Sequence, residues 1–476
     1  MERQTDSALV GRIIQIAFSL VFVGICLYGL RGMMFGSAAM AKFIAAGATG
    51  AAITFALDKR YWLLPAFLFG FQDTLPALKF TGLDLGSIIL ISICFIRRAL
   101  QKDYALKGTQ GLSLVAIPFL VWMCLVWFLH PVGMFIFGSA SIGGRFYLKV
   151  VLAFLSLITL SSIWLNERDS KAILFCYLIG ILVKIVRGLF FGGMEDAISG
   201  GVHYQFADFG YLSAFFLCRF SAVELLSHVW PFCGFFLSFI LTMYSGNRHM
   251  FAVPPFVGLI IPLLLRRDRV RTYLLAGLAI VGLAIVVAGH GSIWRLPFSV
   301  QRSLSILPGN WDYRLHSYGF NDNFRATLRM YAREHIAESP WFGDGGFSLD
   351  YSEMAWVVAS AYNYRGDMYT GHILARNWHN VWLGMAADFG IPFSVAWAFF
   401  TVVLLVMGFK WVRAAPRGSW FQTASSYFYV IILVTWVDFF FNGGHSAKTP
   451  ERFFIWSGLL HAVANGYLIN RQSMEH

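Results

Sequence analysis

The chain has 476 residues, of which 58% are hydrophobic and only 13% are charged, and its mean hydropathy is +0.63. This is too little charge to cover a soluble protein of this length, so the composition excludes a soluble enzyme and indicates a polytopic helical membrane protein. The net charge of +12 does not indicate nucleic-acid binding, because surplus Lys and Arg in membrane proteins collect in cytoplasmic loops.

Apolar windows of about 20 residues, the length that crosses a bilayer as a helix, recur along the whole chain. The pattern predicts an all-α membrane protein with about 12–14 transmembrane helices. The spans at 61–79 and 84–97 are the weakest, and one of them could be re-entrant. The fourteen candidate spans are 11–30, 36–57, 61–79, 84–97, 112–130, 147–166, 171–190, 205–224, 227–244, 249–265, 271–290, 380–409, 424–442 and 451–470.

The connections between these spans alternate between basic ones and ones with few Lys or Arg. Because basic connections stay in the cytoplasm, we expect both termini inside and residues 291–378 on the opposite side. The basic set comprises the N-terminus, 58–60, 97–107, 167–171, a turn near 225, 266–272, 410–417 and the C-terminus. The other set lies near 31–35, 80–83, 131–146, 191–204, 244–248 and 443–450.

The chain divides into four parts on this topology. Residues 1–200 hold N-terminal transmembrane helices, and residues 201–290 hold further transmembrane helices with Arg248. Residues 291–378 form one large extramembrane loop, and residues 379–476 hold the C-terminal transmembrane helices. A loop as long as 291–378 in a compact membrane protein usually carries function.

The large loop contains eight Arg, no Lys and eight acidic residues. Its stretch "NDNFRATLRMYAREHIAESPWFGDGGF" predicts an amphipathic helix that begins near Asp322 or Asn323 and ends before Pro340. One face of this helix would carry Leu328, Tyr331, Ala332 and His335. The glycines that follow, Gly343 and Gly345, predict a structural turn and lack the spacing of a phosphate-binding loop.

Two arginines are candidate anion-binding groups. Arg248 lies at the outer end of a span, and Arg325 begins the predicted loop helix. A guanidinium presents a planar fork of donors that suits phosphate oxygens. The alternatives are a snorkelling interfacial arginine for Arg248 and a solvated charge for Arg325, the reading that also fits Arg329 and Arg333.

A polar cluster opens the span that follows the loop, with Arg376, Trp378, His379 and Asn380 in "ARNWHNVWLGMAADFGIP". Taken alone, the cluster fits an interfacial anchor. Its place where a wide outer loop re-enters the membrane also fits an active site, since a neutral imidazole can take a proton from a sugar hydroxyl near neutral pH.

No metal or cofactor site is expected. The sequence contains no HExxH, CxxC or DxD-type pair, and Asp344, Asp350 and Glu353 lack diagnostic metal spacing. All six cysteines fall in apolar stretches and are expected to be buried apolar residues, with no disulfide framework. They are Cys26, Cys94, Cys124, Cys176, Cys218 and Cys233.

The order of these elements resembles the O-antigen ligase and polymerase family of bacterial inner-membrane glycosyltransferases. The resemblance runs over about 205–395. It consists of a span ending in "SGNR", then "HMFAVPPFVGLIIPLLL" and a basic turn, a large outer loop with "FRATLRMYAREHIAESPWFGDG", and "HNVWLGMAADFGIP" opening the next span. It implies a GT-C-like membrane fold with its active site facing the periplasm.

The resemblance also implies roles for individual residues. Arg248 and Arg325 would hold a lipid pyrophosphate, His379 would be the catalytic histidine, and Arg376 and Asn380 would help to bind substrate. The sequence departs from the family pattern in two places: Ser245 is separated from Arg248 by two residues, and Pro392 replaces the second glycine after His-Asn. The first departure bears on Arg248, and the second bears on helix packing.

The activity implied is transfer of a polyprenyl-pyrophosphate-linked glycan to an acceptor sugar hydroxyl. Polymerisation of O-antigen or exopolysaccharide repeat units is the favoured reaction, with ligation to lipid A core as the alternative and transfer to protein as a third variant. The partners would be the lipid-linked oligosaccharide, the glycan or lipid A core acceptor, the bilayer and a chain-length regulator. A lipid-linked sugar transporter is the rival from another class, because Lys184 and Arg187 lie within a candidate span.

Overall fold

The computed structural model of the chain describes eleven stretches, and its described residues are almost entirely helical. One isolated β-bridge joins His290 and Trp294. The all-α class is therefore confirmed for this part of the chain, whereas a GT-C-like topology stays a prediction. The stretches are 60–72, 81–100, 110–130, 144–191, 204–265, 269–312, 315, 322–345, 378, 380–441 and 448–475.

The helices follow one another along the chain in a fixed order. They are α3 (Leu63–Phe71), α4 (Gly82–Leu100), α5 (Gln110–Leu129), α6 (Gly144–Ser161), α7 (Glu167–Phe191), η2 (Tyr204–Asp208), α9 (Phe209–Arg219), α10 (Ala222–Ser227), α11 (Val229–Tyr244), α12 (Arg248–Leu265), α13 (Arg269–Gly289), α14 (Phe298–Leu304), α16 (Asp322–Glu338), α19 (Val381–Phe389), α20 (Ile391–Ala414), α21 (Trp420–Phe441) and α22 (Lys448–Glu475).

Within the described stretches, five helices are long and apolar enough to cross a membrane, namely α7, α12, α13, α20 and α21. Shorter apolar segments occur in α4, α5, α6 and α11. Large apolar side chains such as Leu278 on α13 and Phe399 on α20 are exposed, and a bilayer would cover such faces. The described residues are thus compatible with a multi-pass membrane protein, while the number of spans stays a prediction.

The predicted span over 380–409 is not one helix. Helix α19 ends at Phe389 and α20 begins at Ile391, with Gly390 between them at φ 88° and ψ 162°. Essentially only glycine occupies this backbone region. Pro392 in the first turn of α20 lacks the N–H that a continuous helix would use to bond one turn back.

The predicted span over 205–224 is also interrupted, because Ser221 starts a new helix. Ser221 Oγ accepts a hydrogen bond from the Glu224 N–H at 3.3 Å, and Glu224 Oε2 accepts one from the Ser221 N–H at 2.8 Å. This reciprocal cap divides the segment into α9 and the short α10, which then leads into α11.

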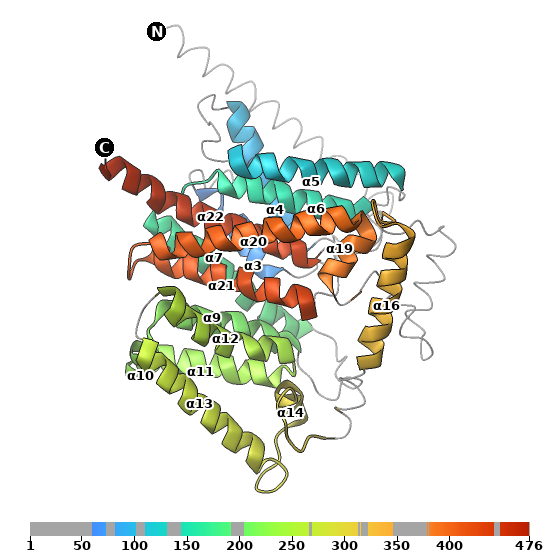
Figure 1. The fold of residues 1–476 in the computed structure, drawn as a ribbon. Helices are drawn as coiled ribbons and strands as arrows, with labels where there is room; N and C mark the ends of the chain where they lie inside the picture. Colours follow the sequence, from blue (N-terminus) through green and yellow to red (C-terminus); the bar gives the residue numbers. More distant parts are fainter. Residues whose placement is uncertain are drawn as a thin grey trace, which may run out of the picture.

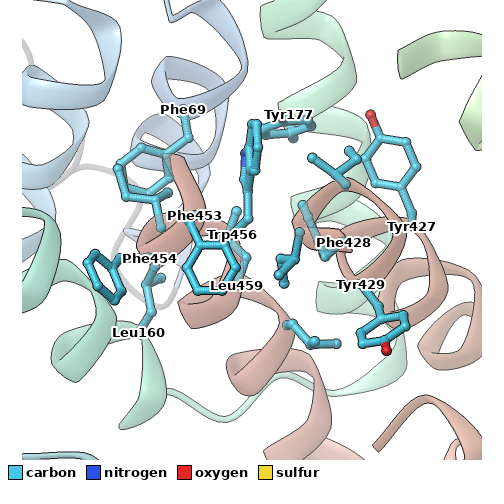
Figure 2. Close-up of a cluster of buried hydrophobic side chains, with 14 of the residues drawn as sticks. Phe69, Leu160, Tyr177, Tyr427, Phe428, Tyr429, Phe453, Phe454, Trp456 and Leu459 are labelled. Atoms are coloured by element: carbon cyan, nitrogen blue, oxygen red, sulfur yellow. The ribbon is translucent and has the colours of Figure 1, made fainter. Parts of the chain in front are cut away.

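Aromatic side chains of α22 belong to a buried cluster that they share with side chains of α3, α6, α7 and α21 (Figure 2). The ring centroid of Phe454 lies 4.3 Å from that of Phe154 on α6. The ring centroid of Tyr177 on α7 lies 5.6 Å from that of Phe428 on α21. Of the five membrane-length helices, α21 is the most deeply buried and α13 the most exposed.

Helix α16 lies across one end of the bundle beside α19, away from the C-terminus (Figure 1). We call this end the α16 end. The last turn of α21 contacts α19 through Phe439 and Trp382, and it contacts the first turn of α12 through Asp438 and His249. These turns therefore lie at the α16 end.

Candidate functional site

Arg248 is the first residue of α12, at the α16 end. The turn before it is built by Ser245, whose buried hydroxyl donates to Thr242 O at 2.6 Å and accepts from the Asn247 N–H at 3.1 Å. The Arg248 Nε–H donates to the backbone carbonyl of Arg302 on α14 at 3.1 Å. One guanidinium N–H therefore orients the side chain, and the displaced serine has a structural role in the turn.

The last turns of α21 contact both segments that the sequence singled out. On one side, Asp438 Oδ1 lies 3.4 Å from Nδ1 of His249, the residue after Arg248. On the other side, the ring of Phe439 lies 5.5 Å from that of Trp382, two residues after Asn380. Arg248 and Asn380, far apart in the sequence, therefore belong to helices that meet around the same end of α21.

Buried charges cluster beside this region. Asp84 is 0% exposed and accepts hydrogen bonds from the Thr81 N–H at 2.8 Å and the Thr81 hydroxyl at 2.9 Å. The ammonium of Lys149, 1% exposed, lies 3.5 Å from Asp84 Oδ2. Glu451 is also 1% exposed and interacts electrostatically with both. The ammonium offsets part of the cost of burying two carboxyl groups.

A second ion pair joins α7 to η2. Nζ of Lys184 lies 2.6 Å from Oδ2 of Asp208, and both side chains are mostly buried. Lys184 is one of the two charges, with Arg187, that the sequence places inside an apolar span, and this pair supplies its counter-ion. The pair neutralises a cation that would otherwise be costly near lipid.

The turn after α16 docks onto the break between α19 and α20. The N–H groups of Asp344 and Gly345 donate to the carbonyls of Ala387 and Asp388 at 3.0 and 3.1 Å, and the Ile391 N–H donates to Pro340 O at 2.8 Å. The turn thus satisfies backbone groups that the ends of two helices leave without partners.

The glycines allow this close approach. Gly343 and Gly345 have φ of 67° and 73°, and a Cβ on Gly343 would lie 2.5 Å from the backbone carbon of Asp388.

Asn380 and Trp378 flank the proposed catalytic histidine. The Asn380 side chain caps α19 by accepting a hydrogen bond from the Leu383 N–H at 3.0 Å. Trp378 is 1% exposed and packs against Ala332 of α16 and Ala387 of α19. The substrate-binding role expected of Asn380 stays a prediction beside this capping role.

The other predicted site residues are only partly described. Arg325 lies in the first turn of α16, and its side chain is outside the described residues. His379 and Arg376 also lie outside the described residues. The amphipathic helix predicted before Pro340 is confirmed as α16, with Leu328 and Ala332 fully buried.

Sequence reasoning missed most of the charged partners. Asp84, Lys149 and Glu451 each lie near the start of a predicted apolar span and were not singled out, although a charge at such a position is itself a signal of function or pairing. Nothing in the sequence predicts the contact between His335 and Asp344. In the structure, Nδ1 of His335 lies 3.1 Å from Oδ2 of Asp344. Their pairing depends on the turn that folds back onto α16.

Of the predicted binding and catalytic residues, the side chains of Arg248 and Asn380 are described, and each makes a hydrogen bond to the backbone. Over the described stretches, no group of three or more His, Cys, Asp or Glu side chains has the geometry of a metal site. No protein-family model matches the chain, and no significant match to a curated protein was found.

Proposed function

We propose that this chain is a glycosyltransferase of the bacterial inner membrane that uses a polyprenyl-pyrophosphate-linked glycan at the periplasmic face. Its most favoured reaction is polymerisation of O-antigen or exopolysaccharide repeat units. The observation that carries the proposal is the contact of the last turns of α21 with both His249, beside Arg248, and Trp382, beside Asn380. Two elements of the resemblance thereby share one end of the bundle.

The chemistry requires charge neutralisation and one base. The acceptor hydroxyl oxygen forms a bond to the anomeric carbon, the bond from that carbon to the phosphate oxygen breaks, and polyprenyl pyrophosphate leaves. Arg248 and Arg325 would stabilise the negative charge that develops on the leaving group. His379 would accept the hydroxyl proton as general base.

An apolar groove at the same end supports a lipid-linked donor. The groove has a volume of about 560 Å³ and lies between the turn after α16 and the first turns of α20. Its walls include Trp341, Pro392, Val395 and Phe399. A polyprenyl chain lying there would keep its pyrophosphate at the membrane interface.

The decisive experiment complements a deletion strain with variants and analyses the surface glycan. We expect His379→Ala to abolish chain formation while the protein is still inserted at the wild-type level. His228→Ala, at an exposed turn between α10 and α11, is the matched control and should restore wild-type glycan. Normal glycan with His379→Ala would show that His379 is not the base.

The deletion strain itself separates polymerase from ligase. A single repeat unit left on the lipid A core indicates a polymerase, because ligation still occurs without polymerisation. Complete loss of glycan from the core, with polymer retained on the lipid carrier, indicates a ligase.

A transporter of lipid-linked sugars is the second candidate, favoured by the buried charges of Asp84, Lys149 and Glu451. In vesicles that contain the purified protein, a transporter would move labelled lipid-linked repeat units across the bilayer without changing their length. A glycosyltransferase would lengthen the glycan or move it to a new acceptor.

A further inference from the structure

Three buried charged side chains meet where α4 and α22 both pack against α6. Asp84 lies in the first turn of α4, Lys149 in the second turn of α6 and Glu451 in the first turn of α22. Nζ of Lys149 lies 3.5 Å from Oδ2 of Asp84. The carboxyl groups of Glu451 and Asp84 are within hydrogen-bonding reach of each other. We call these three residues the buried charge cluster.

The charges of this cluster do not balance when both carboxyl groups are ionised, because two carboxylates then face one ammonium. Arg452, the next residue on α22, also acts on Glu451, but it acts on Asp438 of α21 as well. These two further charges cancel, so one negative charge is left over. A surplus charge that is removed from water is costly unless it is neutralised.

The hydrogen bonds of the two carboxyl groups are also incomplete. Oδ2 of Asp84 accepts bonds from the N–H and the hydroxyl of Thr81. Its Oδ1 and both carboxyl oxygens of Glu451 are buried and accept no hydrogen bond from any residue that the structure describes. An ionised carboxylate can only accept, so two facing carboxylates cannot bond to each other. One proton between them would supply the missing donor and also remove the surplus charge.

We propose that Asp84 and Glu451 form a proton-binding site in which the two carboxyl groups share one proton. The protonated carboxyl group donates its O–H to the other, while Oδ2 of Asp84 keeps its bonds to Thr81 and its ion pair with Lys149. The pair then carries a single negative charge, which Lys149 balances. The proton belongs to the pair and not to either residue. The site is independent of the proposed glycan transfer, in which neither carboxyl group takes part.

Infrared spectroscopy tests the site directly, because the C=O stretch of a protonated carboxyl group is distinct from the bands of a carboxylate. We expect the purified wild-type protein, in a detergent without ester groups, to show this C=O band at neutral pH. The band should shift in protein equilibrated with D2O, because a deuteron then replaces the proton. A wild-type spectrum without the band would overturn the proposal.

Two replacements show whether the proton is shared. Glu451→Gln and Asp84→Asn each place an amide N–H donor beside the remaining carboxyl group, which can then ionise as the partner of Lys149. We expect each single variant to lose the band completely. Glu334→Gln, on the exposed face of α16, is the matched control and should keep the band.

Two results with these variants would overturn the shared site. A band that persists in Asp84→Asn would show that burial alone protonates Glu451. A band that persists in Glu451→Gln would place the proton on another residue.

A third variant tests the donor by stability and does not depend on spectroscopy. Glu451→Met has a similar volume but no donor, so Oδ1 of Asp84 stays buried without a hydrogen bond. We expect its thermal midpoint in detergent to fall below that of Glu451→Gln, which should stay close to wild type. Equal midpoints for the Met and Gln variants would show that Asp84 accepts no hydrogen bond from position 451, and would contradict the proposal.

Discussion

Lys149 shows how a single buried charge depends on its partners. Its ammonium is 1% exposed and lies 3.5 Å from Asp84, with Glu451 close by. Removing one member of a buried ion pair leaves an uncompensated charge and typically costs about 3–5 kcal/mol. Replacing the lysine with an apolar residue of similar size therefore tests the charge with little change in volume.

We expect Lys149→Met to lower the free energy of unfolding by about 3 kcal/mol, because the buried carboxylate of Asp84 loses its cation. Thermal denaturation of the purified protein in detergent measures the change. Lys410→Met, at an exposed position on α20, is the control and should stay within about 0.5 kcal/mol of wild type. Equal stability of the two variants would contradict the role of the ion pair.

The two candidate arginines should be sensitive to loss of charge. We expect Arg248→Gln and Arg325→Gln each to lower kcat by about 100-fold, the typical effect of losing a donor that stabilises a developing anion. The corresponding Lys variants should keep part of the activity, since they keep the charge and lose the planar fork. Arg333→Gln, on the exposed face of α16, is the matched control. If Arg248→Gln or Arg325→Gln is as active as this control, the replaced arginine does not stabilise the leaving group.

At the scale of secondary-structure elements, the break between α19 and α20 is the feature that shapes the site. The carbonyl oxygen of Trp341 approaches Gly390 so closely that a Cβ there would lie 2.0 Å away. The break leaves backbone N–H and C=O groups without partners inside the helices, and the turn after α16 forms hydrogen bonds with them. Helix α16 is thereby anchored to the span that follows the outer loop.

We expect Gly390→Ala to destabilise the protein by about 2 kcal/mol more than Gly418→Ala. Both glycines have positive φ, at 88° and 72°, but a Cβ on Gly418 would meet nothing within 4 Å. The larger loss at Gly390 therefore combines the steric clash with the turn and the backbone strain that Ala meets at ψ 162°. Thermal denaturation in detergent provides the measurement, and equal losses for the two variants would mean that the turn is not packed against the break.

At the scale of the whole molecule, α16 lies across one end of the bundle (Figure 1). On the topology that the charge distribution of the connections predicts, we expect this end to face the periplasm. We expect an alkaline phosphatase fusion at Asn310 to be active and a fusion at Gly418 to be inactive. An inactive fusion at Asn310 and an active fusion at Gly418 would show that the topology is the reverse of the predicted one, with the proposed site in the cytoplasm.

The sequence alone predicted the features that depend on local patterns. Hydropathy indicated the helical membrane class, and the amphipathic period with Pro340 predicted α16 and its end. Hydropathy wrongly predicted one continuous helix at 380–409 and another at 205–224, because the residues stay apolar through the point where each helix ends and the next begins. At 380–409, Gly390 adopts a backbone conformation with positive φ that ends α19, and hydrogen bonds from the turn after α16 stabilise it. At 205–224, the reciprocal cap at Ser221 starts a new helix.

Composition and periodicity by themselves predicted an apolar, helical chain, because hydropathy and helix formation depend on residues that are close in the sequence. Only the tertiary structure decided which charges meet: Lys149 with Asp84, His249 with Asp438, and His335 with Asp344. Each pair joins two different elements, so its existence depends on how those elements pack and not on the period of either. The same reason explains why the contacts around Trp378 emerge only from the folded chain.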